Sequence, residues 1–263
     1  MIAATGDPRI VEPLRAAGCV FAEDEAALLV EAAAGDGDDL RAMLERRVAG
    51  EPLEHVVGWA QFRGLRIEVG PGVFVPRPRT EALVGHAAML ARDVSRPIVV
   101  DLCCGSGALG VALASELANV ELHASDIDPV AVAFARRNVG SVAGRAYVGD
   151  MADALPRELR GRVDVLVANV PYVPTCDIEL LPREARKHEP RHTLDGGEDG
   201  LDLARGVAEI AAGWLAPGGH VLIEVTPEQA RMLTGVFEWA ALAARTFTDD
   251  ELDATVVVGT RHA

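Results

Sequence analysis

The chain divides into two parts that differ in the spacing of their apolar residues. Over residues 8–50, leucine, valine and methionine recur at about helical spacing among charged residues, and residues 32–37 interrupt the run. This pattern predicts amphipathic helices. From about residue 80, short apolar runs alternate with segments of helical pattern, which indicates a mainly parallel sheet covered on both faces. The runs expected as strands are 97–102, 120–125, 146–148, 163–168 and 220–225.

Two regions depart from this alternation. Apolar and charged residues alternate over 65–69, and after Gly70-Pro71-Gly72 a second apolar stretch covers 73–75, which predicts a short hairpin. Near the C-terminal end, 243–248 and 254–259 are separated by only a short acidic stretch, so we expect them to pair as antiparallel strands. We therefore divide the chain into a helical N-terminal domain (1–55), a β-hairpin linker (56–78) and an α/β domain (79–263).

Composition narrows the function. The chain has 263 residues, of which 49% are hydrophobic, enough for one full core and a small accessory domain. A net charge of -15 without a basic run disfavours nucleic acid as a substrate and suits a basic protein partner. The four cysteines form no CxxC pair, which fits a reducing cytoplasm. We read no signal peptide and no apolar run of bilayer length, so we expect a cytoplasmic protein without membrane contact.

The segment from Val99 to Gly110 has the pattern of a strand, a glycine-rich turn and a helix. Gly105 and Gly107 permit a tight turn and let a ligand approach the backbone. Taken alone, GxGxxG also fits dinucleotide binders. Asp101, at the end of the strand, would repel a pyrophosphate but suits the cationic amino-acid end of S-adenosylmethionine. We therefore favour S-adenosylmethionine over NAD as the cofactor.

The ends of the next two strands extend this site. Asp126 is placed to bind both ribose hydroxyls, and Ile127 to pack on the adenine ring. Asp150, after the third strand, is placed to accept a hydrogen bond from the adenine amino group. An aspartate at a strand end often only caps the next helix. The interpretation depends on the whole set, because ligands of open α/β sheets bind where the carboxyl ends of the strands meet.

A further motif, Asn169-Val170-Pro171-Tyr172, follows the apolar run 163–168. The side-chain oxygen of Asn169 and the carbonyl of Val170 can accept the two hydrogens of a planar NH2 group. Pro171 shapes the turn, and the ring of Tyr172 can cover the face of the group. Alone, the motif is typical of a strand-ending turn. Downstream of a methyl-donor site, it predicts methyl transfer to a planar nitrogen.

Residues from about 50 to 260 resemble the HemK/PrmC-type protein-(glutamine-N5) methyltransferases. The resemblance implies a class I S-adenosylmethionine-dependent methyltransferase fold: a Rossmann-like, mostly parallel seven-stranded sheet with an antiparallel last strand, behind a small helical domain. It also implies methylation of a protein glutamine, typically the GGQ glutamine of a peptide-chain release factor, with Thr80, Cys103 and Asn169 beside the methyl donor. The motifs that carry it, in order, are 74–81, 101–107, Asp126, 169–172, 189–190, 196–201, 215–219 and 224–229.

Two residues depart from the family pattern. Val170 stands where the family has a proline, and Arg79 where it has a glutamate, and the N-terminal helical region looks shorter. Three other functions remain open: an amino-methyltransferase of nucleic acid, a catalytically idle S-adenosylmethionine-binding homologue, and an NAD-dependent oxidoreductase. Residues 188–192 match HExxH, but Pro190 interrupts the helix that this zinc pattern needs, so we expect no metal.

Overall fold

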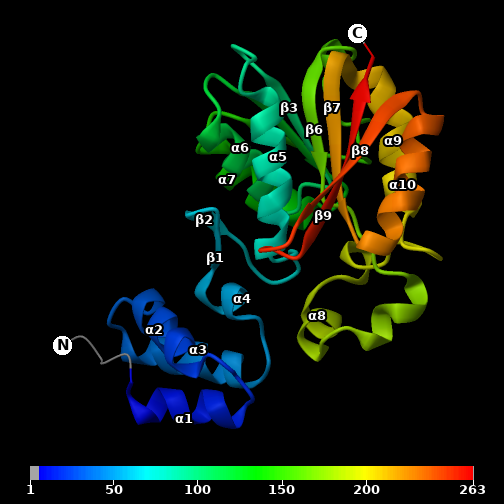
Figure 1. The fold of residues 1–263 in the computed structure, drawn as a ribbon. Coiled ribbons are helices and arrows are strands. Elements are labelled where there is room, and N and C mark those ends of the chain that lie inside the picture. The colour runs from blue at the N-terminus through cyan, green and yellow to red at the C-terminus, as the bar shows by residue number, and fades with distance from the viewer. Residues whose placement is uncertain (1–5, 263) are drawn as a thin grey trace.

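The computed structural model describes residues 6–262, in which a group of short helices lies beside an α/β sandwich (Figure 1). The helices pack around a small core that includes Leu14, Leu29 and Val56. They confirm the helical pattern predicted over 8–50. Besides the predicted break at 32–37, the helices are also interrupted at 17–21. Their bounds are α1 Pro8–Ala16, α2 Ala22–Ala32, α3 Gly37–Val48 and α4 Leu53–Val57.

A hairpin follows these helices, but the predicted pairing of 65–69 with 73–75 was wrong. The antiparallel partner of β2 (Leu65–Glu68) is the preceding β1 (Trp59–Phe62), and residues 73–75 form no strand. The connecting residues Arg63 and Gly64 both have positive φ, 47° and 77°. A two-residue turn of this kind usually contains Asn-Gly or Asp-Gly. Here its first residue is Arg63, so the sequence pattern did not predict the turn.

The seven-stranded sheet has the order β5-β4-β3-β6-β7-β9-β8, and its first five strands are parallel. The last strand of the chain, β9, is antiparallel as predicted, and it lies between β7 and β8 rather than at the edge. β7 begins five residues earlier than the apolar run indicated. The strand bounds are β3 Ile98–Leu102, β4 Glu121–Asp126, β5 Arg145–Val148, β6 Val163–Ala168, β7 Leu215–Val225, β8 Leu242–Asp249 and β9 Ala254–Arg261.

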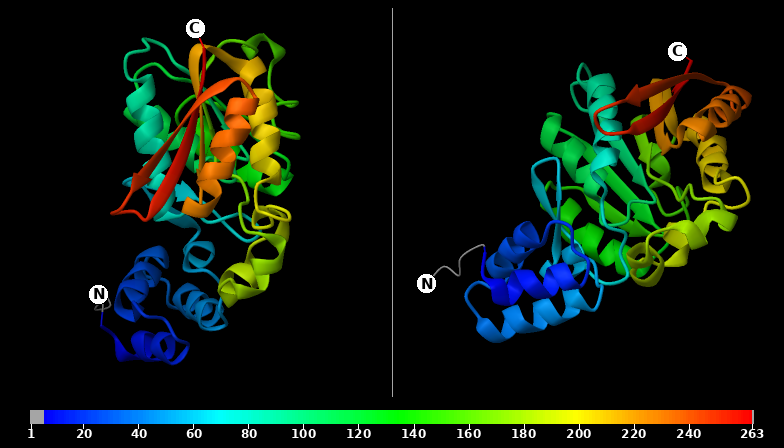
Figure 2. Two further views of the ribbon diagram at one scale, coloured as in Figure 1. Left: turned by 45° about the vertical axis from the view of Figure 1, so that its right-hand side comes forward. Right: turned by 60° about the horizontal axis from the view of Figure 1, so that its bottom comes forward.

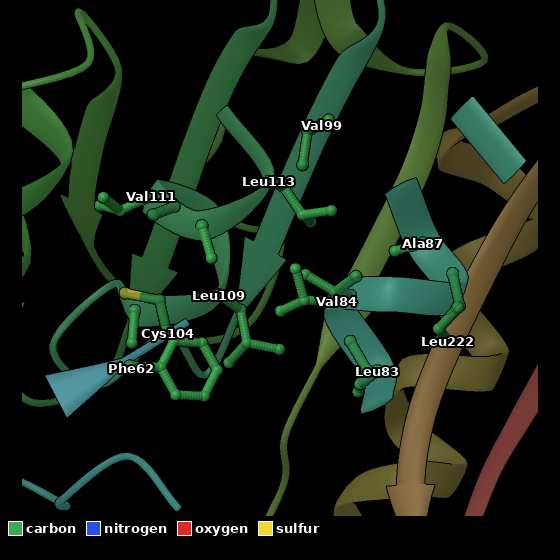
Figure 3. Packing of buried hydrophobic residues seen from close by; sticks show 14 of the residues in the cluster. Phe62, Leu83, Val84, Ala87, Val99, Cys104, Leu109, Val111, Leu113 and Leu222 are labelled. Atoms are coloured by element: carbon green, nitrogen blue, oxygen red, sulfur yellow. The ribbon is translucent and has the colours of Figure 1, made fainter. Parts of the chain in front are cut away.

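Helices cover both faces of this sheet, as the two views in Figure 2 show. On one face α5 (Glu81–Ala91), α6 (Ala108–Glu116) and α7 (Pro129–Gly140) bury a core that also takes in Phe62 of the hairpin (Figure 3). On the other face lie α9 (Asp202–Trp214) and α10 (Pro227–Trp239). Alternate strand residues serve the two cores, Val99 one and Val100 the other.

This arrangement determines what lies next to the carboxyl ends of the parallel strands. The carboxyl ends of the parallel strands point toward the N-terminal helices and toward the segment that carries α8 (Arg183–His188) (Figure 1). Ligands of open α/β sheets bind at this edge. Between residues 6 and 262, the longest and most apolar helices still fall short of what a membrane crossing requires.

Candidate functional site

A cavity of about 700 Å³ lies at the carboxyl edge of the parallel strands. Its walls come from the loop around residues 74–80, the turns after β3, β4, β5 and β6, and the segment around α8. Two predicted site residues, Asp101 and Gly107, do not line it. The others do: Thr80, Cys103, Gly105, Asp126, Ile127, Asp150, Asn169, Val170, Pro171 and Tyr172.

The glycine-rich turn after β3 (residues 103–107) needs left-handed backbone at three positions. Cys103, Gly105 and Gly107 have φ of 52°, 53° and 79°. A Cβ added to Gly105 would meet nothing within 4 Å, because this glycine faces open space. A Cβ on Gly107 would lie 2.8 Å from a methyl group of Val139. Gly105 therefore keeps the cavity open, whereas Gly107 allows α6 to pack against α7.

Asp126 joins the turn to the end of β4. Its Oδ2 accepts a hydrogen bond of 2.8 Å from the Gly105 amide, and its Oδ1 accepts one of 2.9 Å from the Asp128 amide. Burial raises the pKa of Asp126, and these two amides oppose the rise. Each carboxylate oxygen has a second lone pair for a ligand hydroxyl. Next to it, Ile127 is 61% exposed and forms part of the cavity wall.

Asp101 lies behind the turn rather than in the cavity wall. It is fully buried, and its Oδ2 accepts a hydrogen bond of 2.9 Å from the Gly110 amide. Its Oδ1 has no hydrogen-bond partner among the described residues. Desolvation raises the pKa of Asp101 to about 8, and the nearby charge of Asp126 adds to the rise. Asp101 therefore makes no contact with the cavity, and its carboxyl is mainly protonated below about pH 8.

Residues 169–172, which the sequence predicts to bind an amide and which are called the amide-binding turn for that reason, begin where β6 ends. Asn169 Nδ2 donates a hydrogen bond of 3.3 Å to Thr80 Oγ1, at the start of α5. Val170 is 2% exposed and packs in the core, and it is also one of the residues that line the cavity. Burial raises the pKa of Tyr172, which therefore stays neutral. The cavity thus has carboxylates along one wall and this turn along the other.

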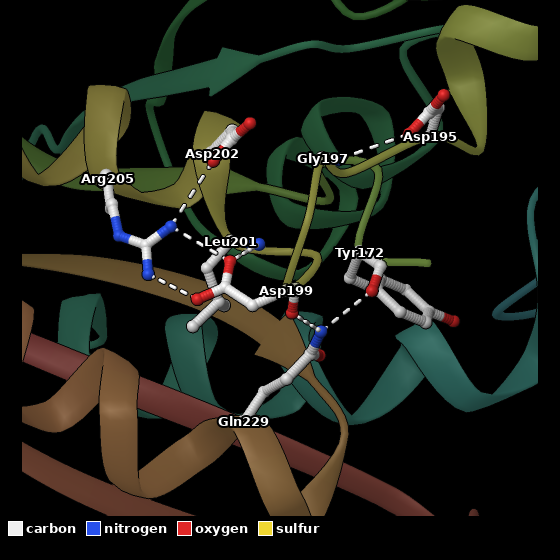
Figure 4. Close-up of polar contacts among 8 residues, drawn as sticks. All are labelled: Tyr172, Asp195, Gly197, Asp199, Leu201, Asp202, Arg205 and Gln229. Carbon is white, nitrogen blue, oxygen red and sulfur yellow. Dashed lines mark hydrogen bonds and ion pairs between the residues drawn. The ribbon is translucent and has the colours of Figure 1, made fainter. Parts of the chain in front are cut away.

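A second loop holds this turn from behind, and its role escaped the sequence-based site prediction. Gln229 Nε2 donates to the carbonyl oxygens of Tyr172 and Asp199, at 2.8 Å and 3.0 Å (Figure 4). Gly196 and Gly200 lie so close that a Cβ would come within 2.6 Å of the Pro171 oxygen and 2.2 Å of the Tyr172 oxygen. Both glycines and Gln229 occur in the motif set, which was the available signal.

Two buried glutamates pair with arginines of the 74–80 loop. Glu189 forms an ion pair with Arg77, and Glu224, at the end of β7, forms one with Arg79. The HExxH match therefore does not lie within one helix. α8 ends at His188, and the side chain of Glu189 accepts a hydrogen bond from Arg77. Among residues 6–262 no group of three His, Cys, Asp or Glu side chains is arranged to hold a metal ion.

The fold and this strand-edge site define a class I methyltransferase, and the comparisons agree. A family model described as Methyltransferase small domain matches residues 68–181. Release factor glutamine methyltransferase of Streptomyces coelicolor is 45% identical over 197 residues, covering 74% of this chain and 70% of that protein. The Bifidobacterium longum enzyme of that name is 35% identical over 270 residues, covering 90% and 92%. The chain belongs to the release factor glutamine methyltransferase family, as its motifs indicated.

The comparisons also reach relatives with other names. The 4-amino-L-phenylalanine/4-methylamino-L-phenylalanine methyltransferase of Streptomyces pristinaespiralis is 36% identical over 216 residues, covering 79% of this chain and 73% of that protein. A solved 16S rRNA N2 methyltransferase of T. thermophilus, in complex with AdoMet and guanosine, has a TM-score of 0.54 at 22% identity. The match covers 78% of this chain and 50% of the T. thermophilus chain, and it supports the fold alone.

Proposed function

We propose that this chain transfers the methyl group of S-adenosylmethionine to the side-chain amide nitrogen of the GGQ glutamine in a peptide-chain release factor. One observation carries the proposal: Asn169 lies in the cavity wall with its Nδ2 bound to Thr80, so its Oδ1 is left for a substrate N–H. Membership in the family, whose named relatives are release factor glutamine methyltransferases, supports this choice of substrate.

The residues at the strand edge fit the methyl donor. Gly105 offers an open backbone, Asp126 a carboxylate for the ribose hydroxyls, and Asp150 an acceptor for the adenine amino group. Ile127 would pack on the adenine face, and Thr80 and Cys103 would lie beside the amino-acid end. When bound, S-adenosylmethionine supplies an electrophilic methyl group on a sulfonium cation. A nearby cation would favour the ionised form of Asp101, whose buried Oδ1 has no hydrogen-bond partner among residues 6–262.

The amide-binding turn compensates for a weak nucleophile. A glutamine amide nitrogen reacts poorly because its lone pair is delocalised into the carbonyl. The Asn169 side-chain oxygen and the Val170 carbonyl would accept its two hydrogens, and they bind the nitrogen more tightly as it gains positive charge. That charge acidifies the nitrogen, which passes one proton to solvent water, so no dedicated base is needed. Valine at position 170 keeps the carbonyl that this step needs.

A second candidate acceptor is a small aromatic amine. The specific observation is the relative named for 4-amino-L-phenylalanine, which is matched over most of its length. A cavity of about 700 Å³ with Phe74 and Tyr172 in its wall has room for such an amino acid. An arylamine also presents a planar NH2 group, so the same amide-binding turn would serve.

We place the reaction in the cytoplasm. The four cysteines are unpaired, and two of them, Cys103 and Cys104, form part of the glycine-rich turn. A reducing compartment keeps such thiols free. Burial raises the pKa of the Cys103 thiol to about 12, so it stays protonated beside the methyl donor and does not compete as a nucleophile.

One assay decides between the two acceptors. Purified protein is given methyl-labelled S-adenosylmethionine and either a release factor or 4-amino-L-phenylalanine, with Asn169→Ala as the control for the amide-binding turn. We expect label on the release factor, none on a release factor whose GGQ glutamine is replaced, and a loss of about 100-fold with Asn169→Ala. Label on the amino acid alone would establish the second candidate, and label on neither would contradict both.

A further inference from the structure

Arg79, one of the two residues that depart from the family pattern, forms part of the cavity wall. We propose that Arg79 binds an oxygen atom of the methyl acceptor, either a peptide carbonyl or a free carboxylate. In this role Arg79 selects acceptors that present such an oxygen near the reacting NH2 group. The inference rests on the proposed function, in which the acceptor nitrogen lies against Asn169 and Tyr172.

The loop that carries Arg79 contacts the amide-binding turn at its first and its last residue. The neighbouring Thr80 accepts a hydrogen bond of 3.3 Å from Nδ2 of Asn169, with which the turn begins. The guanidinium carbon of Arg79 lies 5.9 Å from the ring centroid of Tyr172, with which the turn ends. All four residues line the same cavity. Arg79 therefore lies beside the place where the acceptor amide is expected to bind.

The guanidinium of Arg79 keeps its hydrogen-bond donors for a ligand. Its Nε is buried and lies 2.9 Å from Oε1 of Glu224, as an ion pair without hydrogen-bond alignment. Its two terminal nitrogens make no hydrogen bond to any residue between 6 and 262, and the side chain is 31% exposed. The N–H groups of an arginine form a planar fork that suits carboxylate and carbonyl oxygens. Arg77, also in the cavity wall, differs because one of its terminal nitrogens already donates to Glu189.

Glu224 offsets the charge of Arg79. Methyl transfer involves a sulfonium cation and builds positive charge on the acceptor nitrogen, and an unpaired guanidinium nearby would repel both. The Glu224 side chain is only 1% exposed and does not line the cavity, so its carboxylate opposes the guanidinium from behind the wall. The ion pair therefore offers N–H donors to the acceptor while adding little net charge to the site.

The oxygen that Arg79 binds is not the oxygen of the reacting amide. A cationic donor on that oxygen would draw the nitrogen lone pair further into the carbonyl and weaken the nucleophile. The oxygens that remain belong to the main chain of the acceptor. In a release factor this is a backbone carbonyl of the GGQ loop, and in 4-amino-L-phenylalanine it is the α-carboxylate. A simple arylamine such as 4-methylaniline has the NH2 group but no such oxygen.

The test compares the wild type with Arg79→Lys and with a double variant that combines Arg79→Gln and Glu224→Gln. Lysine keeps a positive charge opposite Glu224 but has no planar fork. The double variant removes both charges, so that neither stays buried without its partner. We measure kcat and KM with a release factor, with 4-amino-L-phenylalanine and with 4-methylaniline. Calorimetry gives the Kd for S-adenosylmethionine, and thermal unfolding verifies the fold.

We expect both variants to raise the KM for the acceptor by about 10- to 100-fold, because hydrogen bonds from a charged group are lost. The kcat and the Kd for S-adenosylmethionine should stay near their wild-type values, since Arg79 touches neither the donor nor the reacting nitrogen. A higher KM for the release factor identifies a peptide carbonyl as the bound oxygen. A higher KM for 4-amino-L-phenylalanine identifies the carboxylate, and 4-methylaniline should then react equally with all three proteins.

An unchanged KM in the folded variants would overturn the inference, as would a fall in kcat alone or an equal loss with 4-methylaniline. Arg79→Lys decides alone if the double variant does not fold. A wild-type protein that methylates neither the release factor nor 4-amino-L-phenylalanine overturns the proposed function and this inference with it. An active wild type whose KM is insensitive to both variants removes only the role of Arg79.

Discussion

The side-chain amide of Gln229 donates a hydrogen bond of 2.8 Å to the backbone carbonyl of Tyr172. Its second N–H reaches the Asp199 carbonyl, and its Oε1 accepts from the Thr226 amide at 3.1 Å in a capping box. One side chain therefore caps α10 and fixes the backbone of the amide-binding turn. The turn owes its shape to a helix that begins more than fifty residues further along the chain.

Replacing Gln229 with glutamate separates these two roles. Glutamate keeps an oxygen for the capping box but has no N–H for the carbonyls of Tyr172 and Asp199. We expect Gln229→Glu to lower kcat about tenfold, because the amide-binding turn loses its support. Thr226→Ala is the matched control: it should cost about 1 kcal/mol of unfolding free energy with little change in kcat. Steady-state kinetics and denaturant unfolding of both variants check this, and unchanged turnover in Gln229→Glu would contradict it.

Gly200 allows the supporting loop to touch the amide-binding turn. It has a φ of 79°, and a Cβ there would lie 2.2 Å from the Tyr172 oxygen and 2.3 Å from Gln229 Nε2. We expect Gly200→Ala to lower the free energy of unfolding by about 2–4 kcal/mol and to reduce activity. Gly235, in α10, meets nothing within 4 Å, so Gly235→Ala should instead raise stability by about 0.5–1 kcal/mol. Similar unfolding curves for the two variants would refute the close contact.

Asp126 is the residue on which binding of the methyl donor should depend most. Asp126→Ala removes the expected ribose contacts and the support of the Gly105 amide. We expect the Kd for S-adenosylmethionine to rise about 100-fold, from two lost hydrogen bonds to a charged group. Asp128→Ala removes an equal charge two residues away, outside the cavity wall, and should change the Kd little. Calorimetry distinguishes the two, and equal effects would point to general electrostatics instead of contact.

Asp101 should make stability depend on pH. Its pKa is about 8 in the folded protein against an ordinary value of 3.8. The unfolded chain loses this proton first, so the folded state becomes less stable as pH rises from about 4 to about 8. Asp101→Asn carries no such penalty. It should match the wild type in free energy of unfolding near pH 4 and exceed it by on the order of 1–3 kcal/mol near pH 9, while binding S-adenosylmethionine more weakly. Denaturant unfolding at both pH values checks this, and parallel pH curves would argue against a buried carboxylate of raised pKa.

The architecture was predictable because local patterns determine most of it. Buried parallel strands are short apolar runs, so β3, β4, β5 and β6 were located within a residue or two, and a short acidic connection identified the antiparallel pair β8 and β9. The hairpin was misplaced because its turn, Arg63-Gly64, lacks the usual residue types. β7 was predicted too short because Ala216, Pro217, Gly218 and Gly219 do not resemble a strand.

The site was predictable only where its residues share a strand end. Asp126 ends β4, Asp150 comes two residues after β5, and Asn169 directly follows β6, so strand order alone brings them together. The partner of Asn169 depends on packing between distant segments, because Thr80 comes from the start of α5. Residue spacing along the chain does not predict a contact between segments so far apart. The same holds for Asp101, whose position behind the turn follows from how α6 packs on β3.

The central claim is tested most directly by locating the transferred methyl group. The protein is incubated with S-adenosylmethionine and a peptide-chain release factor, and tandem mass spectrometry of the digested release factor identifies the modified atom. The account predicts one methyl group on the side-chain amide of the GGQ glutamine, absent when Asn169→Ala is used. An unmodified GGQ glutamine, in a reaction where calorimetry shows S-adenosylmethionine bound, would contradict it.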